Sequence, residues 1–121
     1  MIHLSQARSS IIFEHDGDSL AVLYWGKKLG AITEKSAESI MSALTKPAFH
    51  GGLDVSSSNL ILREHSRGWI GHPALRGHRG GVGASNSFTV KSAIQKDQSM
   101  VAIFADAIAG LEIEITYTLT P

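Results

Sequence analysis

The strictest pattern in this chain is the alternation of apolar and polar residues over positions 111–119. Successive side chains of a β-strand point to opposite faces, so this period of two predicts a strand with one buried and one solvated face. Such a strand needs neighbouring strands and a facing layer to bury its apolar side. The apolar positions are Leu111, Ile113, Ile115, Tyr117 and Leu119, and the polar positions between them are Glu112, Glu114, Thr116 and Thr118.

A β-hairpin is predicted near the start of the chain. The runs Ser10–His15 and Leu20–Trp25 are rich in β-forming residues, and the Asp-Gly-Asp-Ser sequence between them is a turn in which Gly17 can adopt a positive φ. The second run is apolar on both faces, which favours an interior strand.

The remaining elements complete a mainly β prediction. Apolar residues at helical spacing predict one short helix over Thr33–Leu44, with Thr33 or Ser36 as N-cap. Residues 49–58 are predicted to be a loop. Three further strands are predicted at Asn59–Arg63, Phe88–Ile94 and Met100–Ala107. The sum is an antiparallel β-sandwich with one short helix, as a single domain over residues 1–121.

The charge balance of the chain argues against nucleic acid and anionic membranes as partners. Eleven basic side chains balance eleven acidic ones, so the whole chain has no electrostatic reason to bind nucleic acid or an anionic membrane. Cysteine is absent, and neither a signal peptide nor an apolar run long enough to span a membrane is present. These observations predict a cytoplasmic protein without membrane contact, and no motif calls for a cofactor.

The segment Arg63–Gly81 carries most of the functional potential. It contains four arginines, three of the six histidines and one of the two tryptophans among several glycines, with no helical or strand period. Many hydrogen-bond donors in one loop are costly to order unless something uses them. The simplest interpretation is a solvated loop held by a few salt bridges, and the alternative is a binding surface.

Known catalytic patterns are absent from this segment. Glu64, His65, His72 and His78 have spacings that match no helical metal motif, so we predict no metal site. No serine lies in a Gly-x-Ser-x-Gly elbow. The glycines at 77, 80 and 81 lack the Lys-Ser/Thr ending of a phosphate loop.

Two features of the segment suit ligand binding. Trp69 could stack on a sugar ring, or it could fold back as a plug. Arg76 and Arg79 could hold hydroxyls or a carboxylate in fork geometry, or they could form internal salt bridges, for instance with Glu64.

The run from Leu62 to Arg79, Leu-Arg-Glu-His-Ser-Arg-Gly-Trp-Ile-Gly-His-Pro-Ala-Leu-Arg-Gly-His-Arg, resembles the N-terminal domain of bacterial α-galactosidases of glycoside hydrolase family 36. Tyr24-Trp25-Gly26, Ser87-Phe88 and the run from Ala109 to Ile113 resemble the family in the same order. The resemblance covers most of the chain, and the central run is its most specific part.

The resemblance implies that the chain is a fragment of a longer multidomain enzyme. Family members continue from a supersandwich related to aldose mutarotases into a (β/α)8 barrel with two catalytic aspartates, followed by a C-terminal β-domain. Retaining hydrolysis needs two carboxylates about 5–5.5 Å apart. The chain alone is therefore expected to have no catalytic residues, and Glu64 is not assigned as one.

The resemblance also suggests a role for the loop. In oligomeric members, the N-terminal domain helps to close the active-site pocket of a neighbouring subunit. The implied partners are the barrel of the same polypeptide, further copies in a homo-oligomer, and α-galactoside sugars. The residues implied in sugar binding or subunit contact are Trp69, His72, Arg76 and His78. Other branches of the family carry an aspartate–arginine pair in this loop, and this sequence does not.

Three other functions stay open at this point. A free-standing carbohydrate-binding module would use Trp69 as its platform. A mutarotase-like enzyme would need a histidine and a glutamate as acid and base. Nucleic-acid binding through the basic loop has the least support, because the loop's excess charge is small.

Overall fold

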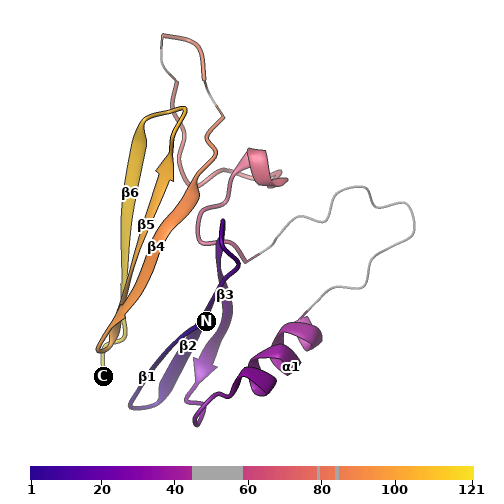
Figure 1. Ribbon diagram of the computed structural model, residues 1–121, viewed down its shortest axis with the longest axis vertical. Coiled ribbons are helices and arrows are strands. Elements are labelled where there is room, and N and C mark those ends of the chain that lie inside the picture. The colour runs from indigo at the N-terminus through magenta and orange to yellow at the C-terminus, as the bar shows by residue number, and fades with distance from the viewer. Residues whose placement is uncertain (45–58, 79, 84) are drawn as a thin grey trace, which may run out of the picture.

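The fold is described by a computed structural model that covers residues 1–44, 59–78, 80–83 and 85–121. Two antiparallel three-stranded sheets face each other, with one α-helix beside the first sheet (Figure 1). The first sheet contains β1 (Ile2–Gln6), β2 (Ser9–His15) and β3 (Leu20–Lys27), and the second contains β4 (Thr89–Lys96), β5 (Ser99–Asp106) and β6 (Leu111–Thr118). The helices are α1 (Glu34–Leu44) and the short 3-10 turn η1 (His65–Arg67).

The first sheet is a meander of two hairpins in the order β1-β2-β3. Gly17 has φ +97° in the turn between β2 and β3, as the sequence predicts. Asp16 closes this turn, because its Oδ1 accepts hydrogen bonds from the backbone N–H and the hydroxyl of Ser19, each at 2.8 Å. A β-bulge between Ile12 and Phe13 shifts the register of the β2–β3 pair.

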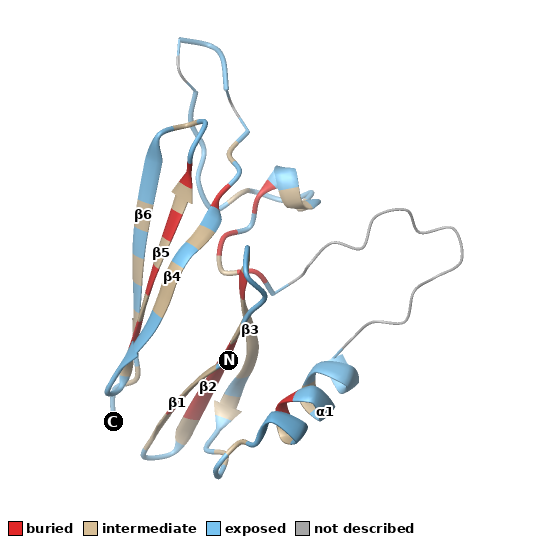
Figure 2. Ribbon diagram, viewed as in Figure 1, coloured by how far each residue is buried: buried red, intermediate tan, exposed pale blue. Residues whose placement is uncertain are grey.

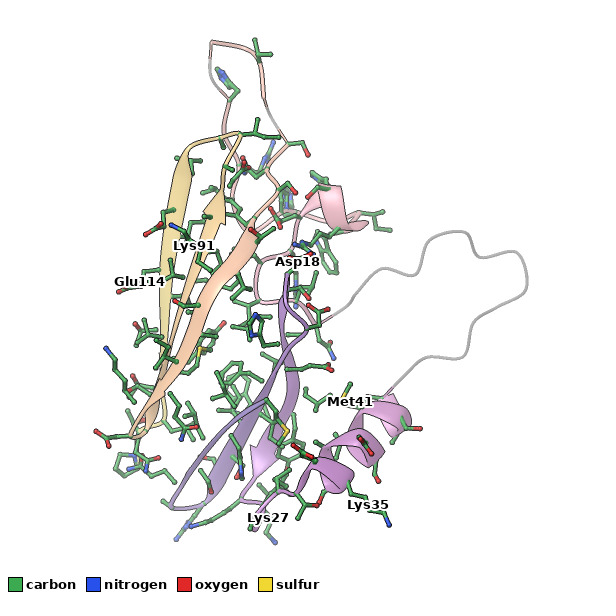
Figure 3. All side chains as sticks on the ribbon, in the orientation of Figure 1. Asp18, Lys27, Lys35, Met41, Lys91 and Glu114 are labelled. Atoms are coloured by element: carbon green, nitrogen blue, oxygen red, sulfur yellow. The ribbon has the colours of Figure 1, made fainter. Side chains whose placement is uncertain are left out.

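The second sheet confirms the alternating pattern of the sequence from Glu112 to Thr118, whereas Leu111, predicted on the buried face, is 41% exposed. Ile115 lies opposite Ala102 and Ile113 lies opposite Phe104 in the β5–β6 pair, so their side chains share one face. The glutamates and threonines of β6 are exposed on the other face. Figure 3 shows Glu114 and Lys91 projecting away from the first sheet.

The core lies between the two sheets. Figure 2 shows that buried residues concentrate on β2 and β5, the central strands, because these have neighbours on both sides. Phe13 of β2 meets Tyr117 of β6 with ring centroids 5.2 Å apart. The buried members of this core are Leu4, Ile11, Phe13, Leu20, Leu62, Phe88, Met100, Ala102 and Phe104.

The predicted helix is confirmed, and Thr33 is its cap. The hydroxyl of Thr33 accepts a hydrogen bond from the Ser36 N–H and the hydroxyl of Ser36 accepts one from the Thr33 N–H, both at 3.2 Å. Ala37 is buried, whereas Met41 and Leu44 are exposed. Among the described residues, no helix is both long and apolar enough to cross a membrane.

Three differences from the sequence prediction concern the strands. Asn59–Arg63 is not a strand, because it forms only an isolated bridge between Leu60 and Ala21 and then turns into the core. The strand β1 was not predicted. The strand β3 lies at an edge of its sheet rather than in the interior. The predicted loop at 49–58 lies outside the described residues.

Because β3 lies at the edge of its sheet, the side chain of Trp25 is left exposed. Trp25 pairs with Ile11, so it lies on the core-facing side of β3, yet it is 76% exposed. It borders a groove that also contains Tyr117 of β6. The outer edges of β3 and β6 therefore flank apolar surface that the described residues leave open.

We expect the isolated chain to self-associate through this surface. In sedimentation or sizing experiments, its apparent mass should rise with concentration, because burying Trp25 and pairing open strand edges are both favourable. Trp25→Ser should shift the chain toward monomer. Leu44→Ser, at an exposed leucine of α1, should leave the association unchanged. A clean monomer at high concentration would contradict the prediction.

Candidate functional site

The predicted functional segment is a loop that connects the two sheets at one end of the molecule (Figure 1). It begins at the Leu60 bridge, makes one turn at η1, and reaches β4 through Phe88. Gly68 ends η1 in the left-handed conformation, with φ 79° and ψ 12°. The loop therefore runs from the β3 side of the first sheet to β4 of the second sheet, and its polar residues lie between these two points.

An ion pair between the buried Glu64 and the partly exposed Arg67 holds the base of this loop, and we call it the Glu64–Arg67 clasp. The Glu64 side chain is 6% exposed, and its Oε1 accepts a hydrogen bond from the Phe88 N–H at 2.9 Å. Its Oε2 lies 3.5 Å from the Arg67 Nε and has no hydrogen-bond partner among the described residues. Arg67 Nη2 donates to the carbonyl oxygens of Phe88 at 2.8 Å and Asp18 at 3.1 Å.

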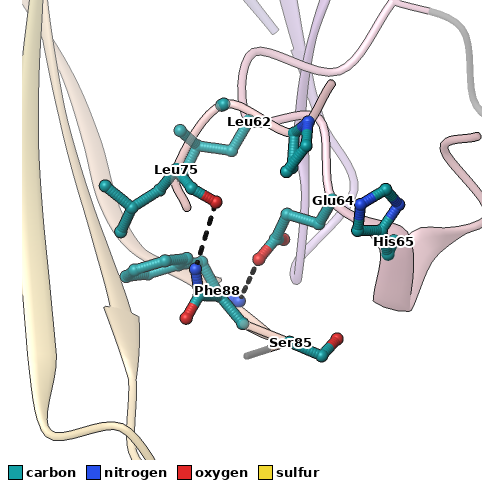
Figure 4. Close-up of a pocket in the computed structure, with 9 residues that line it drawn as sticks. Leu62, Glu64, His65, Leu75, Ser85 and Phe88 are labelled. Carbon is teal, nitrogen blue, oxygen red and sulfur yellow. Dashed lines mark hydrogen bonds between the residues drawn. The ribbon is translucent and has the colours of Figure 1, made fainter. Parts of the chain in front are cut away.

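The clasp joins three parts of the chain. Asp18 belongs to the β2–β3 turn, and Phe88 directly precedes β4, so Arg67 links one sheet to the other through the loop. Figure 4 shows Glu64 directed at Phe88, beside a small hollow whose walls include Leu62, Leu75 and Phe88. Burial is the largest influence on the Glu64 carboxyl and raises its pKa above 4.5, while the Phe88 N–H and Arg67 act in the opposite direction.

A second buried carboxylate is also used in holding the chain. Asp106 is 4% exposed and accepts hydrogen bonds from the N–H groups of Ser87 and Ala109, both at 2.8 Å. Since Glu64 and Asp106 both bind backbone N–H groups at the ends of strands, their contacts are those of structural carboxylates.

Trp69 is folded against its own loop. The guanidinium of Arg63 lies 4.7 Å from the centroid of its ring, and its Nε1 donates to the carbonyl oxygen of His72 at 2.9 Å. A Cβ at Gly71 would lie 2.9 Å from the Nε1, so only glycine allows the indole to lie this close to the backbone. Trp69 therefore organises residues 63–72 locally.

The structure brings only two of the remaining candidate residues together. Arg76 Nη1 lies 3.5 Å from His72 Nδ1, and both residues line a shallow open hollow together with His65. His78 lies farther along the loop, where its Nδ1 accepts a hydrogen bond from the Gly81 N–H at 3.0 Å. Residues Trp69, His72, Arg76 and His78 therefore do not form one compact site.

The suggested ion pair between Arg76 and Glu64 is wrong. Glu64 pairs with Arg67, three residues away, and the structure places Arg76 beside His72 instead. Arg79 lies outside the described residues. Within residues 1–44, 59–78, 80–83 and 85–121, no three metal-ligating side chains come together.

Sequence reasoning missed Arg67 and Asp106. The available signal for Arg67 was its i,i+3 spacing from the only carboxylate of the segment. Asp106 had no such signal, because its partners are backbone N–H groups that become neighbours only when β5 and the loop meet.

Comparison with known proteins gives two findings. The sequence model of the glycosyl hydrolase family 36 N-terminal domain matches residues 18–121. An α-galactosidase of Escherichia coli is 26% identical over 118 residues, which is 98% of this chain and 16% of the length of that relative. This chain therefore spans about a sixth of that enzyme. No solved structure matches.

The clasp predicts a large effect of Arg67→Met on stability. This change leaves the Glu64 carboxylate buried without its counter-charge and removes donors to two carbonyl groups, so the free energy of unfolding should fall by about 3 kcal/mol. Arg76→Met, at an exposed arginine of the same loop, should change it by less than about 0.5 kcal/mol. Urea unfolding monitored by tryptophan fluorescence measures both. Equal effects of the two changes would contradict the role of the clasp.

The raised pKa of Glu64 predicts a pH dependence of stability. The folded state binds the Glu64 proton more tightly than the unfolded state, so this group's contribution is most favourable below 4.5 and falls as the pH rises from there. Glu64→Gln removes that titration. The free energy of unfolding of the natural chain, minus that of Glu64→Gln, should therefore decrease between about pH 4 and about pH 7. An increase over this range would contradict the prediction, since it would mean a lowered pKa.

Proposed function

Because the chain belongs to the glycosyl hydrolase family 36 N-terminal domain family, we propose that it is the non-catalytic N-terminal domain of an α-galactosidase. In this role it supports assembly and forms part of the rim of the sugar-binding pocket. The family match over residues 18–121 carries the proposal, and the match to an α-galactosidase supports the activity. The partners would be a catalytic barrel in the same polypeptide, further copies in a homo-oligomer, and terminal α-galactosides.

The carboxylates support a non-catalytic role. Retaining glycosidases need two carboxyl groups about 5–5.5 Å apart that face the substrate. The buried carboxylates Glu64 and Asp106 instead bind backbone N–H groups. Hydrolysis would thus depend on residues outside this chain.

The open surface supports a role in assembly. A core-facing tryptophan that is 76% exposed, on an edge strand that the described residues cover only near the Leu60 bridge, is costly for a domain that works alone. It suits a domain that packs against more protein. The absence of cysteine fits the cytoplasm, where we place the enzyme.

The loop would contribute the pocket rim. His72 and Arg76 are exposed and can reach a neighbouring surface, whereas Trp69 would shape the loop that presents them. The contacts of Trp69 with Arg63 and Gly71 leave the alternative, a free-standing carbohydrate-binding module with Trp69 as platform, without specific support.

This role predicts a functional effect of Trp69→Ala in the polypeptide that joins this domain to its catalytic barrel. Because the loop loses the group that organises it, kcat/KM for an aryl α-galactoside should fall about tenfold, or the oligomer should dissociate. The loss of activity or assembly should exceed the effect on the melting temperature, because the contacts of the Glu64–Arg67 clasp do not include the Trp69 side chain. Ile94→Ala, at an exposed residue of β4, is the matched control and should leave activity unchanged.

Two outcomes would oppose this role. A lower melting temperature without any effect on activity or assembly would make Trp69 a purely structural residue. Saturable binding of galactose by the isolated chain, measured by calorimetry and lost in Trp69→Ala, would support the carbohydrate-binding module instead.

A further inference from the structure

The open hollow beside His72 is lined by basic residues and by no acidic ones. We call it the basic hollow, and its lining consists of His65, Ile70, Gly71, His72, Pro73 and Arg76. Three of these six residues carry a basic nitrogen group, and none carries a carboxylate. The whole chain has equal numbers of acidic and basic side chains, so this cluster of basic groups is a local feature of the loop.

The formal positive charge of the basic hollow is that of Arg76, and the described residues do not neutralise it. Their ion pairs are Glu64–Arg67 and Lys91–Glu112, so Arg76 has no carboxylate partner among them. The Glu64 carboxylate is buried and directed at Phe88 and Arg67. A guanidinium without a counter-charge in a hollow is available to a negatively charged ligand.

Hydrogen bonds determine which face each imidazole presents. A carbonyl oxygen can only accept, so the His65 Nδ1, 2.7 Å from the Trp69 oxygen, carries a hydrogen. A guanidinium can only donate, so the 3.5 Å contact of Arg76 Nη1 with His72 Nδ1 favours the tautomer in which Nδ1 accepts and Nε2 carries the hydrogen. His72 therefore offers an N–H donor beside the guanidinium of Arg76.

The backbone of the basic hollow is held in place before any ligand arrives. The Trp69 Nε1 holds the His72 carbonyl at 2.9 Å, and the Ala74 N–H donates to the Arg63 carbonyl at 2.8 Å. The ring of Pro73 between these two contacts limits the backbone further. A preorganised site loses less entropy when it binds a small ligand.

We propose that the basic hollow binds a small oxyanion, the carboxylate or phosphate group of a soluble ligand. Arg76 holds it through its planar fork, and His72 donates a further hydrogen bond through Nε2. The inference concerns His72 and Arg76, the residues that the proposed function places at the pocket rim. Anion binding by this chain can be measured without a catalytic barrel, so its failure is distinguishable from failure of the role in an α-galactosidase.

The test is an NMR titration of the 121-residue chain, labelled with ¹⁵N, with inorganic phosphate and separately with acetate, at constant ionic strength. Shifts that saturate and centre on His65, His72 and Arg76 are expected with one or both anions, and the two titrations distinguish phosphate from carboxylate. Arg76→Gln should weaken binding about tenfold or more. Arg8→Gln removes an equal charge at the β1–β2 turn and should leave binding unchanged.

A second variant keeps the result interpretable. His72→Phe removes the Nε2 donor but retains the ring, and should weaken binding while the spectrum stays that of a folded chain. Three results would overturn the proposal: shifts that never saturate, an equal loss in Arg8→Gln and Arg76→Gln, or saturable binding of uncharged galactose at the same residues without binding of either anion.

Discussion

The Glu64–Arg67 clasp is the interaction on which the arrangement of this molecule depends. In the described part of the chain no ladder of strand pairing joins the two sheets, although the Val90 N–H of β4 donates to the Asp18 carbonyl at 3.1 Å. Apolar faces alone would tolerate sliding, because hydrophobic contact has no direction. Hydrogen bonds from Arg67 to carbonyl groups on both sides, and from Phe88 to Glu64, are directional. Burying the Glu64 carboxylate costs solvation, and this cost is offset only in one geometry, so the clasp favours a single docking of the sheets.

The same clasp separates the loop into a fixed base and a presenting part. Before Trp69, the side chains of Arg63, Glu64 and Arg67 are engaged in contacts within the chain, whereas His65 lines the basic hollow. Beyond that point, His72 and Arg76 are exposed and lie next to each other. Arg63 and Arg67 therefore stabilise the loop, whereas Arg76 is exposed to a ligand or partner. The sequence alone does not distinguish these two roles.

The sequence predicted the elements whose signals are local. Alternation over Glu112–Thr118, the Asp-Gly turn and the Thr33 cap each depend on residues within a few positions, and all three are confirmed. The prediction of a strand at Asn59–Arg63 is wrong. The apolar residues Leu60 and Leu62 are buried in the core, but the segment forms only a single bridge to β3.

What was missed depends on distant partners. The strand β1 was missed although Ile2 and Leu4 alternate with His3 and Ser5, because four residues are a short signal. Its polar side is held by the buried hydroxyl of Ser10 on β2, which contacts His3 and Ser5. The choice of Arg67 rather than Arg76 as the partner of Glu64 is likewise made by the carbonyl groups of Asp18 and Phe88, which are brought to Arg67 only by the fold. The i,i+3 spacing allowed the Glu64–Arg67 pair but did not select Arg67 over the other arginines of the segment.

The most direct test of the proposed function is the size of the native polypeptide in its source cells. An immunoblot with an antibody raised against this domain measures it. A band several times larger than the 12.9 kDa of this chain is expected, since the related α-galactosidase devotes only 16% of its length to the matching region. A single band at 12.9 kDa would contradict the account, because the domain would then work without a catalytic barrel in the same polypeptide.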